Sequence, residues 1–157
     1  MQRMFQQALL VLAMAALPAL GADNSLGTWT VSIAKSTYTP SPMPFKSYTM
    51  KREAAEGGVK VTITGERPKG APIKATYTAK FDGSTTPVSG SGVPYNSISV
   101  KQVNANTFTY ELKSSTNKYD AIYRLAVAPD GKSMTVTGQG TDSNGRALTA
   151  KLVFEKQ

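Results

Sequence analysis

Hydrophobic and polar residues alternate along most of this chain with the two-residue period of half-buried β-strands. The first such run, residues 26–33, places Trp29, Val31 and Ile33 on one face and threonine or serine on the other. The alternation recurs in eight later segments, residues 47–54, 59–64, 73–81, 97–103, 107–113, 119–128, 134–139 and 148–154. No segment shows the 3.6-residue period of an amphipathic helix. The pattern therefore predicts an all-β chain of about nine strands.

Short turn sequences separate these segments, which favours antiparallel neighbours. Pro129-Asp130-Gly131-Lys132 and Asp142-Ser143-Asn144-Gly145 are both typical of hairpins. A last strand that returns beside the first would remove both sheet edges. We therefore expect a single antiparallel, up-and-down, calycin-like β-barrel, with a β-sandwich as the alternative. Small inward residues such as Gly138, mixed with bulky ones, would leave either a packed interior or a cavity.

Two connections stand out by composition. Residues 39–45 carry prolines at alternate positions and end at Phe45, which predicts an extended connection that either covers a core edge or forms a flap over a pocket mouth. Residues 83–96 are rich in glycine, serine and proline, which predicts an ordered surface loop with a brief strand at Thr86–Ser89.

The N-terminal 22 residues have the composition of an export signal. Arg3 precedes an apolar run, Ala8–Leu20, and small residues follow at Gly21 and Ala22. As a helix this run rises only about 20 Å, which is short for a membrane span. We expect a signal peptide at residues 1–22, one barrel domain at residues 23–157, no membrane-spanning segment, and a periplasmic or secreted protein.

The chain is basic, with a formal net charge of +8 at pH 7. Its lysines are scattered over the outward faces of the predicted strands, where they can keep the chain soluble and protect sheet edges. Nucleic-acid-binding proteins instead gather such charges with exposed aromatic residues, so we expect no nucleic-acid partner. An anionic surface, such as lipid headgroups or polysaccharide, stays an alternative to a simply solvated face.

The sequence has no histidine and no cysteine. A Ser-His-Asp triad and a thiol nucleophile are therefore impossible, and the best zinc and copper ligands are missing. A pair of carboxylates is the remaining catalytic alternative. We predict no enzyme activity, no metal site and no cofactor.

One set of residues shares the inward parity and combines aromatic rings, hydroxyls and thioether. It consists of Tyr48, Met50, Tyr77, Phe108, Tyr110, Tyr123 and Phe154. Core packing is one interpretation, and the lining of a small-molecule cavity is the other, because ligand sites are mostly apolar with a few polar groups. Phe45 and Arg52 are candidates for the rim of such a cavity.

Several stretches together resemble small exported bacterial lipocalin-like proteins, a group without an assigned function. They are Leu26-Gly27-Thr28-Trp29, Ala34-Lys35-Ser36, Tyr77–Gly83, Pro87–Gly90, Asp130–Thr137 and Gly140-Thr141-Asp142. Gly27-x-Trp29 is also similar to the first-strand signature of lipocalins and fatty-acid-binding proteins. That resemblance implies a structural role for Gly27 and Trp29 at one barrel end, with Lys151 or Lys156 as the cation beside the ring.

The leading functional hypothesis is non-catalytic binding of a small hydrophobic or amphipathic, lipid-like molecule in the barrel. The alternative is an exported interaction or structural module that uses its basic outer face and has no cavity. The oligomeric state is left open by the sequence.

Overall fold

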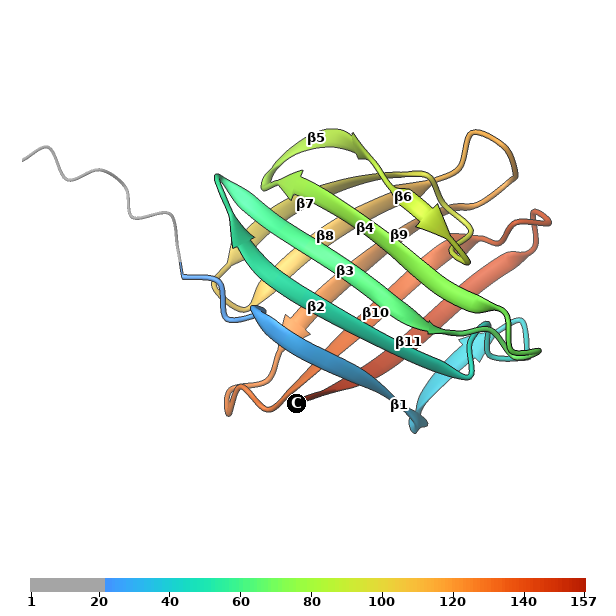
Figure 1. Ribbon diagram of the computed structural model, residues 1–157, viewed down its shortest axis with the longest axis horizontal. Helices are drawn as coiled ribbons and strands as arrows, with labels where there is room; N and C mark the ends of the chain where they lie inside the picture. Colours follow the sequence, from blue (N-terminus) through green and yellow to red (C-terminus); the bar gives the residue numbers. More distant parts are fainter. Residues whose placement is uncertain (1–21) are drawn as a thin grey trace, which may run out of the picture.

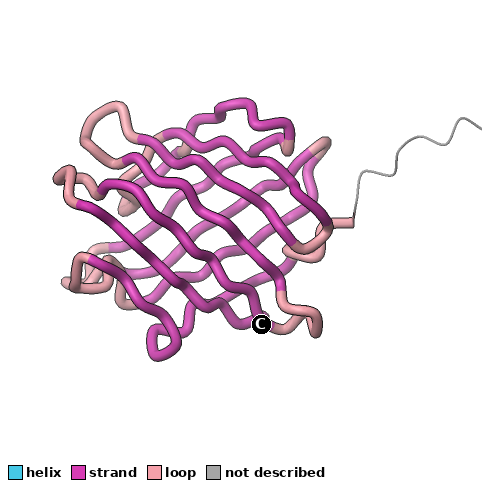
Figure 2. The backbone as a smooth tube through the Cα atoms, turned by 180° about the vertical axis from the view of Figure 1, so that it is seen from behind, coloured by secondary structure: helices cyan, strands magenta, loops and turns pink. Residues whose placement is uncertain are grey.

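The structure, a computed structural model, describes residues 22–157, so the expected signal peptide lies outside the described residues except for Ala22. The described residues form eleven antiparallel strands and no helix, and the strands wrap into one nearly closed barrel (Figures 1 and 2). The strands are β1 (Gly27–Thr39), β2 (Ser47–Ala55), β3 (Gly58–Glu66), β4 (Pro72–Lys80), β5 (Asp82–Pro87), β6 (Ser89–Ser91), β7 (Ser97–Asn104), β8 (Thr107–Lys113), β9 (Asp120–Val127), β10 (Ser133–Thr141) and β11 (Ala147–Lys156).

The first and last strands lie together in the middle of the sheet. The strand order is β5-β7-β8-β9-β10-β11-β1-β2-β3-β4-β6, so β1 pairs with β11 on one side and β2 on the other. The two sheet ends meet at a seam where β5 approaches β4, at the top of Figure 1. There the hydroxyl of Thr86 donates a hydrogen bond to the carbonyl of Thr78, 3.2 Å away. The expected antiparallel barrel is confirmed, and the alternative of a β-sandwich is wrong, because the strands form one continuous sheet.

The barrel has eleven strands rather than the nine that the alternation predicted. The two additional strands, β5 and β6, fall almost wholly in the segment 83–96 that was expected to be mainly loop. β5 pairs with β7 and β6 pairs with β4, so this segment crosses the seam. β6 is exposed throughout and β5 does not alternate between buried and exposed positions. Backbone pairing at a sheet edge forms these strands, and that leaves no period-2 signal in the sequence.

A bulge in β1 corrects one predicted face. The register against β11 shifts between Ser32 and Thr37. Ser36 bridges this irregularity, because its hydroxyl donates to the carbonyl of Ser32 at 2.6 Å and accepts the amide of Val153 at 3.0 Å. Ile33, expected inward beside Trp29, is instead 41% exposed. Beyond the bulge the even-numbered residues of β1 face inward, and Tyr38 is one of them.

Trp29 closes one end of the barrel. It is fully buried, and its indole N–H donates to the carbonyl of Ser25 at 2.9 Å. The Nζ of Lys156 lies 5.5 Å from the ring centroid, so Lys156 and not Lys151 is the cation beside the tryptophan. The segment that precedes β1 is tied to the β7–β8 turn, where the amide of Asn24 donates to the carbonyl of Ala105.

Gly27 is also part of this closed end. Its φ of +126° lies outside the region that side chains favour, and a Cβ there would approach the side chain of Lys156 to 2.9 Å. The nearly closed antiparallel barrel fits a calycin-like fold. Among residues 22–157 there is no helix with the length and apolar character needed to cross a membrane.

Candidate functional site

A pocket of about 140 Å³ opens inside the barrel, toward the end opposite Trp29. Residues from most strands and from three connecting segments line it. They are Tyr38, Pro44, Phe45, Tyr48, Met50, Ile63, Ile73, Tyr77, Gly92, Val93, Pro94, Tyr95, Ile98, Tyr110, Leu112, Tyr119, Tyr123, Leu125, Val136, Leu152 and Phe154. All seven tyrosines of the chain are in this lining. The volume is close to that of an apolar protein cavity known to accept benzene.

The strand pairing explains why rings meet here. Tyr110 and Tyr123 face each other in the β8–β9 register, and Tyr123 in turn lies opposite Gly138 of β10. A Cβ at Gly138 would lie 2.3 Å from the Tyr123 ring, so the missing side chain provides the space for that ring. The small inward residue on β10 thus allows the Tyr123 ring of the neighbouring strand to pack into the pocket wall.

Connecting segments complete the wall, and two of them bring an aromatic ring to it besides Tyr119 of the β8–β9 connection. The connection 40–46 passes through bends at residues 40–42, 44 and 46, so it does not run in the continuously extended form expected from its prolines, and its Thr39–Pro40 and Ser41–Pro42 bonds are cis. It brings Phe45, which is buried, to 5.0 Å from the Tyr48 ring centre. From the loop before β7, Tyr95 lies 5.8 Å from Tyr119. Both loops thus place an aromatic ring against another ring of the pocket lining.

The tyrosine hydroxyls make this apolar pocket locally polar. The hydroxyls of Tyr119 and Tyr123 are 2.9 Å apart and form a hydrogen bond. Burial raises the pKa of Tyr38 to about 12, helped by Tyr123 and Asp142, and burial likewise raises the pKa of Tyr48 and Tyr77. These phenols are therefore neutral near pH 7, and they can donate or accept hydrogen bonds without presenting a charge.

Arg52 is not at a solvent-exposed rim, where parity with Tyr48 and Met50 had suggested it. It is 1% exposed, beneath the pocket toward the Trp29 end. Its Nε donates to the hydroxyl of Ser25 at 2.9 Å, and that hydroxyl donates to Oδ1 of Asp23. The guanidinium lies 5.5 Å and 5.8 Å from the ring centres of Phe108 and Tyr110. Because a buried cation needs partners, this network and the two rings hold it inside the barrel.

The structure brings most of the predicted site residues together. Six of the seven cavity candidates line the pocket, namely Tyr48, Met50, Tyr77, Tyr110, Tyr123 and Phe154. Phe45, the other rim candidate, also lines it. Phe108 does not. It is fully buried nearer the Trp29 end, where the centre of its ring lies 5.2 Å from the centre of the Phe81 ring.

Three tyrosines in the lining were missed by the sequence reasoning. Tyr119 could have been found, because it shares the inward parity of Ala121 and Tyr123. Tyr38 would face outward if β1 alternated regularly, and only the bulge turns it inward. Tyr95 lies in a loop, where alternation of hydrophobic and polar residues predicts nothing. Only the folded chain brings the last two to the pocket.

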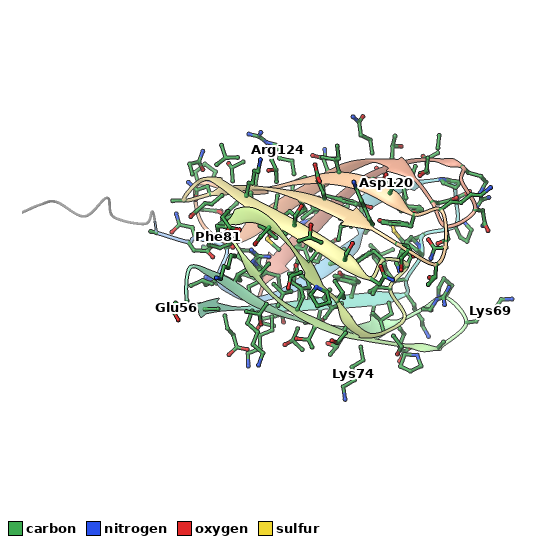
Figure 3. All side chains as sticks on the ribbon, turned by 90° about the horizontal axis from the view of Figure 1, so that it is seen from above. Glu56, Lys69, Lys74, Phe81, Asp120 and Arg124 are labelled. Carbon is green, nitrogen blue, oxygen red and sulfur yellow. The ribbon has the colours of Figure 1, made fainter. Side chains whose placement is uncertain are left out.

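The outer wall carries the scattered cations. Figure 3 shows Lys74 and Arg124 projecting from opposite sides of the barrel, and both are exposed. Lys35 pairs with Glu155 at 2.7 Å, an exposed ion pair of little energetic weight. Within residues 22–157 the cations do not form a single patch with exposed aromatic rings, and no group of three or more acidic residues is placed to hold a metal ion.

Comparisons with known proteins add little to this geometry. No protein-family model matches the sequence, and no curated protein matches it either. Among solved structures, the barrel is similar to the crystal structure of Rv2717c from M. tuberculosis. The two are 14% identical with a TM-score of 0.48, over 85% of this chain and 93% of the other. So distant a likeness carries no information about a ligand.

Proposed function

We propose that this protein binds a small apolar or amphipathic molecule, without catalysis, in the tyrosine-lined pocket of the barrel. The observation that carries the proposal is the gathering of all seven tyrosines around one pocket of about 140 Å³. Ligand sites in proteins are typically concave and mostly apolar, with a few polar groups that orient the ligand. The resemblance to exported lipocalin-like proteins, and the expected signal peptide, would place this activity in the periplasm or outside the cell.

The composition of the wall argues against a purely structural core. A packed interior would favour Leu, Ile, Val and Phe, which bring no hydroxyl to satisfy. Here seven phenols line a space that is not filled, and the hydroxyl of Tyr110 is buried beside the guanidinium of Arg52. A bound molecule would supply the contacts that the unfilled space leaves missing.

The pocket volume sets the size of the first probes. A space of about 140 Å³ suits a single six-membered ring. A longer lipid-like molecule would have to displace Phe45 or Tyr95, which come from loops and can move more easily than strand residues. We therefore expect small aromatic molecules to bind first and long-chain molecules to require loop movement.

The test is a titration of the protein with toluene, indole and dodecanoate, followed by calorimetry and by ligand-observed NMR. We expect saturable binding of at least one ring-sized probe at one site per chain. V136F fills the pocket from β10 and should abolish binding. V103F is the matched control, because Val103 is 56% exposed on the outside of β7 and should tolerate the same substitution. Binding that is absent for every probe, or unchanged in V136F, would refute the proposal.

The basic outer face is the basis of the alternative function. An interaction module would be retained on vesicles of anionic lipid in a salt-dependent way, without uptake of the ring-sized probes. Measuring vesicle retention at low and high salt beside the titration separates the two functions.

A further inference from the structure

We infer that Asn117, which lies outside the pocket, is a positioning residue that closes the pocket mouth and thereby governs how fast ligands exchange and whether a long ligand fits. This inference rests on the proposed function, since it concerns access to the same pocket. Its basis is that the Asn117 side chain is bonded to two different segments of the pocket wall. Its Oδ1 accepts the amide of Tyr119 at 2.8 Å, and its Nδ2 donates to the carbonyl of Pro94 at 2.9 Å.

The bond to Pro94 holds residues 92–95, all four of which line the pocket. Within the described part of the chain it is the only hydrogen bond made by the backbone of these four residues. A segment with so few backbone hydrogen bonds opens more easily than the strands beside it. Asn117 is therefore the main polar attachment of this part of the wall.

The two ends of residues 92–95 are fixed by other contacts. At the start, Gly92 lies so close to β4 that a Cβ there would come within 2.7 Å of the Cα of Ile73. Just after the end, the side chain of Asn96 donates to the hydroxyl of Ser115 at 2.7 Å and accepts the Ser115 amide at 3.2 Å. Outward movement is therefore confined to the residues between these two points.

Tyr95 is the side chain that this segment places against the pocket. Its ring centre lies 5.8 Å from that of Tyr119, and its hydroxyl forms a hydrogen bond with that of Tyr48. Both contacts lie inside the pocket, where an entering ligand can replace them with its own. The bond from Asn117 lies on the exposed side of the segment, beyond the reach of a ligand in the pocket. Opening the mouth therefore breaks the Asn117 bond without compensation from the ligand.

The position of this bond predicts a particular effect on binding. The bond is present in the closed pocket whether it is empty or occupied by a ring-sized ligand, and it is broken only while the mouth is open. Its loss should therefore raise the rates of entry and exit by the same factor and leave the Kd of a ring-sized ligand unchanged. A long ligand that keeps residues 92–95 displaced should instead gain affinity, because its complex no longer loses the bond.

N117D isolates the bond to Pro94. The carboxylate keeps an acceptor for the amide of Tyr119, but it has no N–H to donate to Pro94. N144D is the matched control, because it makes the same change of charge at an exposed asparagine of the β10–β11 turn. The side chain of Asn144 makes no hydrogen bond within residues 22–157.

The first measurement is made without ligand. NMR relaxation dispersion at the amides of Val93 and Tyr95 reports opening on the microsecond-to-millisecond timescale. We expect N117D to raise the population of the open state about tenfold, the effect of about one exposed hydrogen bond, and N144D to leave it unchanged. The Tyr119 amide should stay protected from hydrogen exchange in N117D, because its acceptor is kept.

The second measurement follows indole exchange by NMR and dodecanoate binding by calorimetry. N117D should raise both indole rates about tenfold at constant Kd, and it should raise the affinity for dodecanoate about tenfold. Unchanged opening or unchanged indole rates in N117D would overturn the inference. Weaker indole binding with an unchanged entry rate would also overturn it, since that would show a structural role alone. Failure of wild type to bind any probe would refute the proposed function and the role in access, whereas the dispersion data would still decide whether Asn117 holds the segment.

Discussion

The contact between Gly138 and Tyr123 provides the sharpest test of the pocket geometry. In G138A the added Cβ would lie 2.3 Å from two atoms of the Tyr123 ring and 2.9 Å from a third. Ordinary carbon contacts are at about 3.5–4.0 Å, so the ring must move by more than about 1 Å. Such a movement breaks the hydrogen bond of 2.9 Å between the hydroxyls of Tyr123 and Tyr119.

The expected cost follows from these two losses. Overpacking a core site typically costs about 1–3 kcal/mol, and losing one buried hydrogen bond costs about 1 kcal/mol more. G138A should therefore lower the free energy of unfolding by about 2–4 kcal/mol. In a Y123A background the ring is gone. Alanine then only restricts the unfolded chain, so G138A should be neutral or should stabilise by about 0.5–1 kcal/mol.

The assay is urea-induced unfolding followed by the fluorescence of Trp29, which is fully buried and is the sole tryptophan. Wild type, G138A, Y123A and the double variant form a double-mutant cycle that isolates the contact. T137A is the control on the same strand, because Thr137 is exposed and its loss should have little effect. An equal cost of G138A in both backgrounds would show that the ring does not lie over Gly138, and the reasoning would be wrong.

Three further predictions concern the ends, the seam and the mouth of the barrel. S25A removes the acceptor of the Arg52 Nε hydrogen bond and should lower the free energy of unfolding in urea by about 1–3 kcal/mol; an unchanged value would contradict the buried network. T86V removes the hydrogen bond to Thr78 across the seam and should speed hydrogen exchange in β4 and β5, whereas unaltered protection would mean that other contacts close the barrel. Tyr38 has a pKa of about 12 in the folded state and about 10 when unfolded, so its contribution to stability is complete below about pH 10 and is lost as the pH rises toward 12. Urea midpoints measured over this range should fall less steeply in Y38F, and identical slopes would show that the hydroxyl is not buried.

Much of the fold follows from the alternation in the sequence. The period-2 pattern identified nine of the strands, the antiparallel barrel and most inward faces, the far half of β1 excepted, because side chains on a strand point to alternate faces regardless of its partner. It also identified six pocket residues, since inward parity is a local property. It could not say whether those residues pack together or surround a space. That depends on how far apart the walls of the barrel lie, and small residues such as Gly138 set that distance only in the folded state.

The remaining features depend on pairing between distant segments. Tyr38 faces the pocket because β1 shifts its register against β11, and Tyr95 reaches the pocket because its loop folds over the barrel end. β5 and β6 exist because they pair with the two free edges of the sheet. Arg52 shows the difference most clearly. Its position in the alternation correctly predicted an inward side chain, but its burial depends on the closed barrel end, where it contacts Ser25 and Phe108. The sequence by itself determined which faces of the regular strands turn inward, and the tertiary structure decided where a bulge reverses them and what those faces meet, because contacts across a barrel join residues that are far apart in the chain.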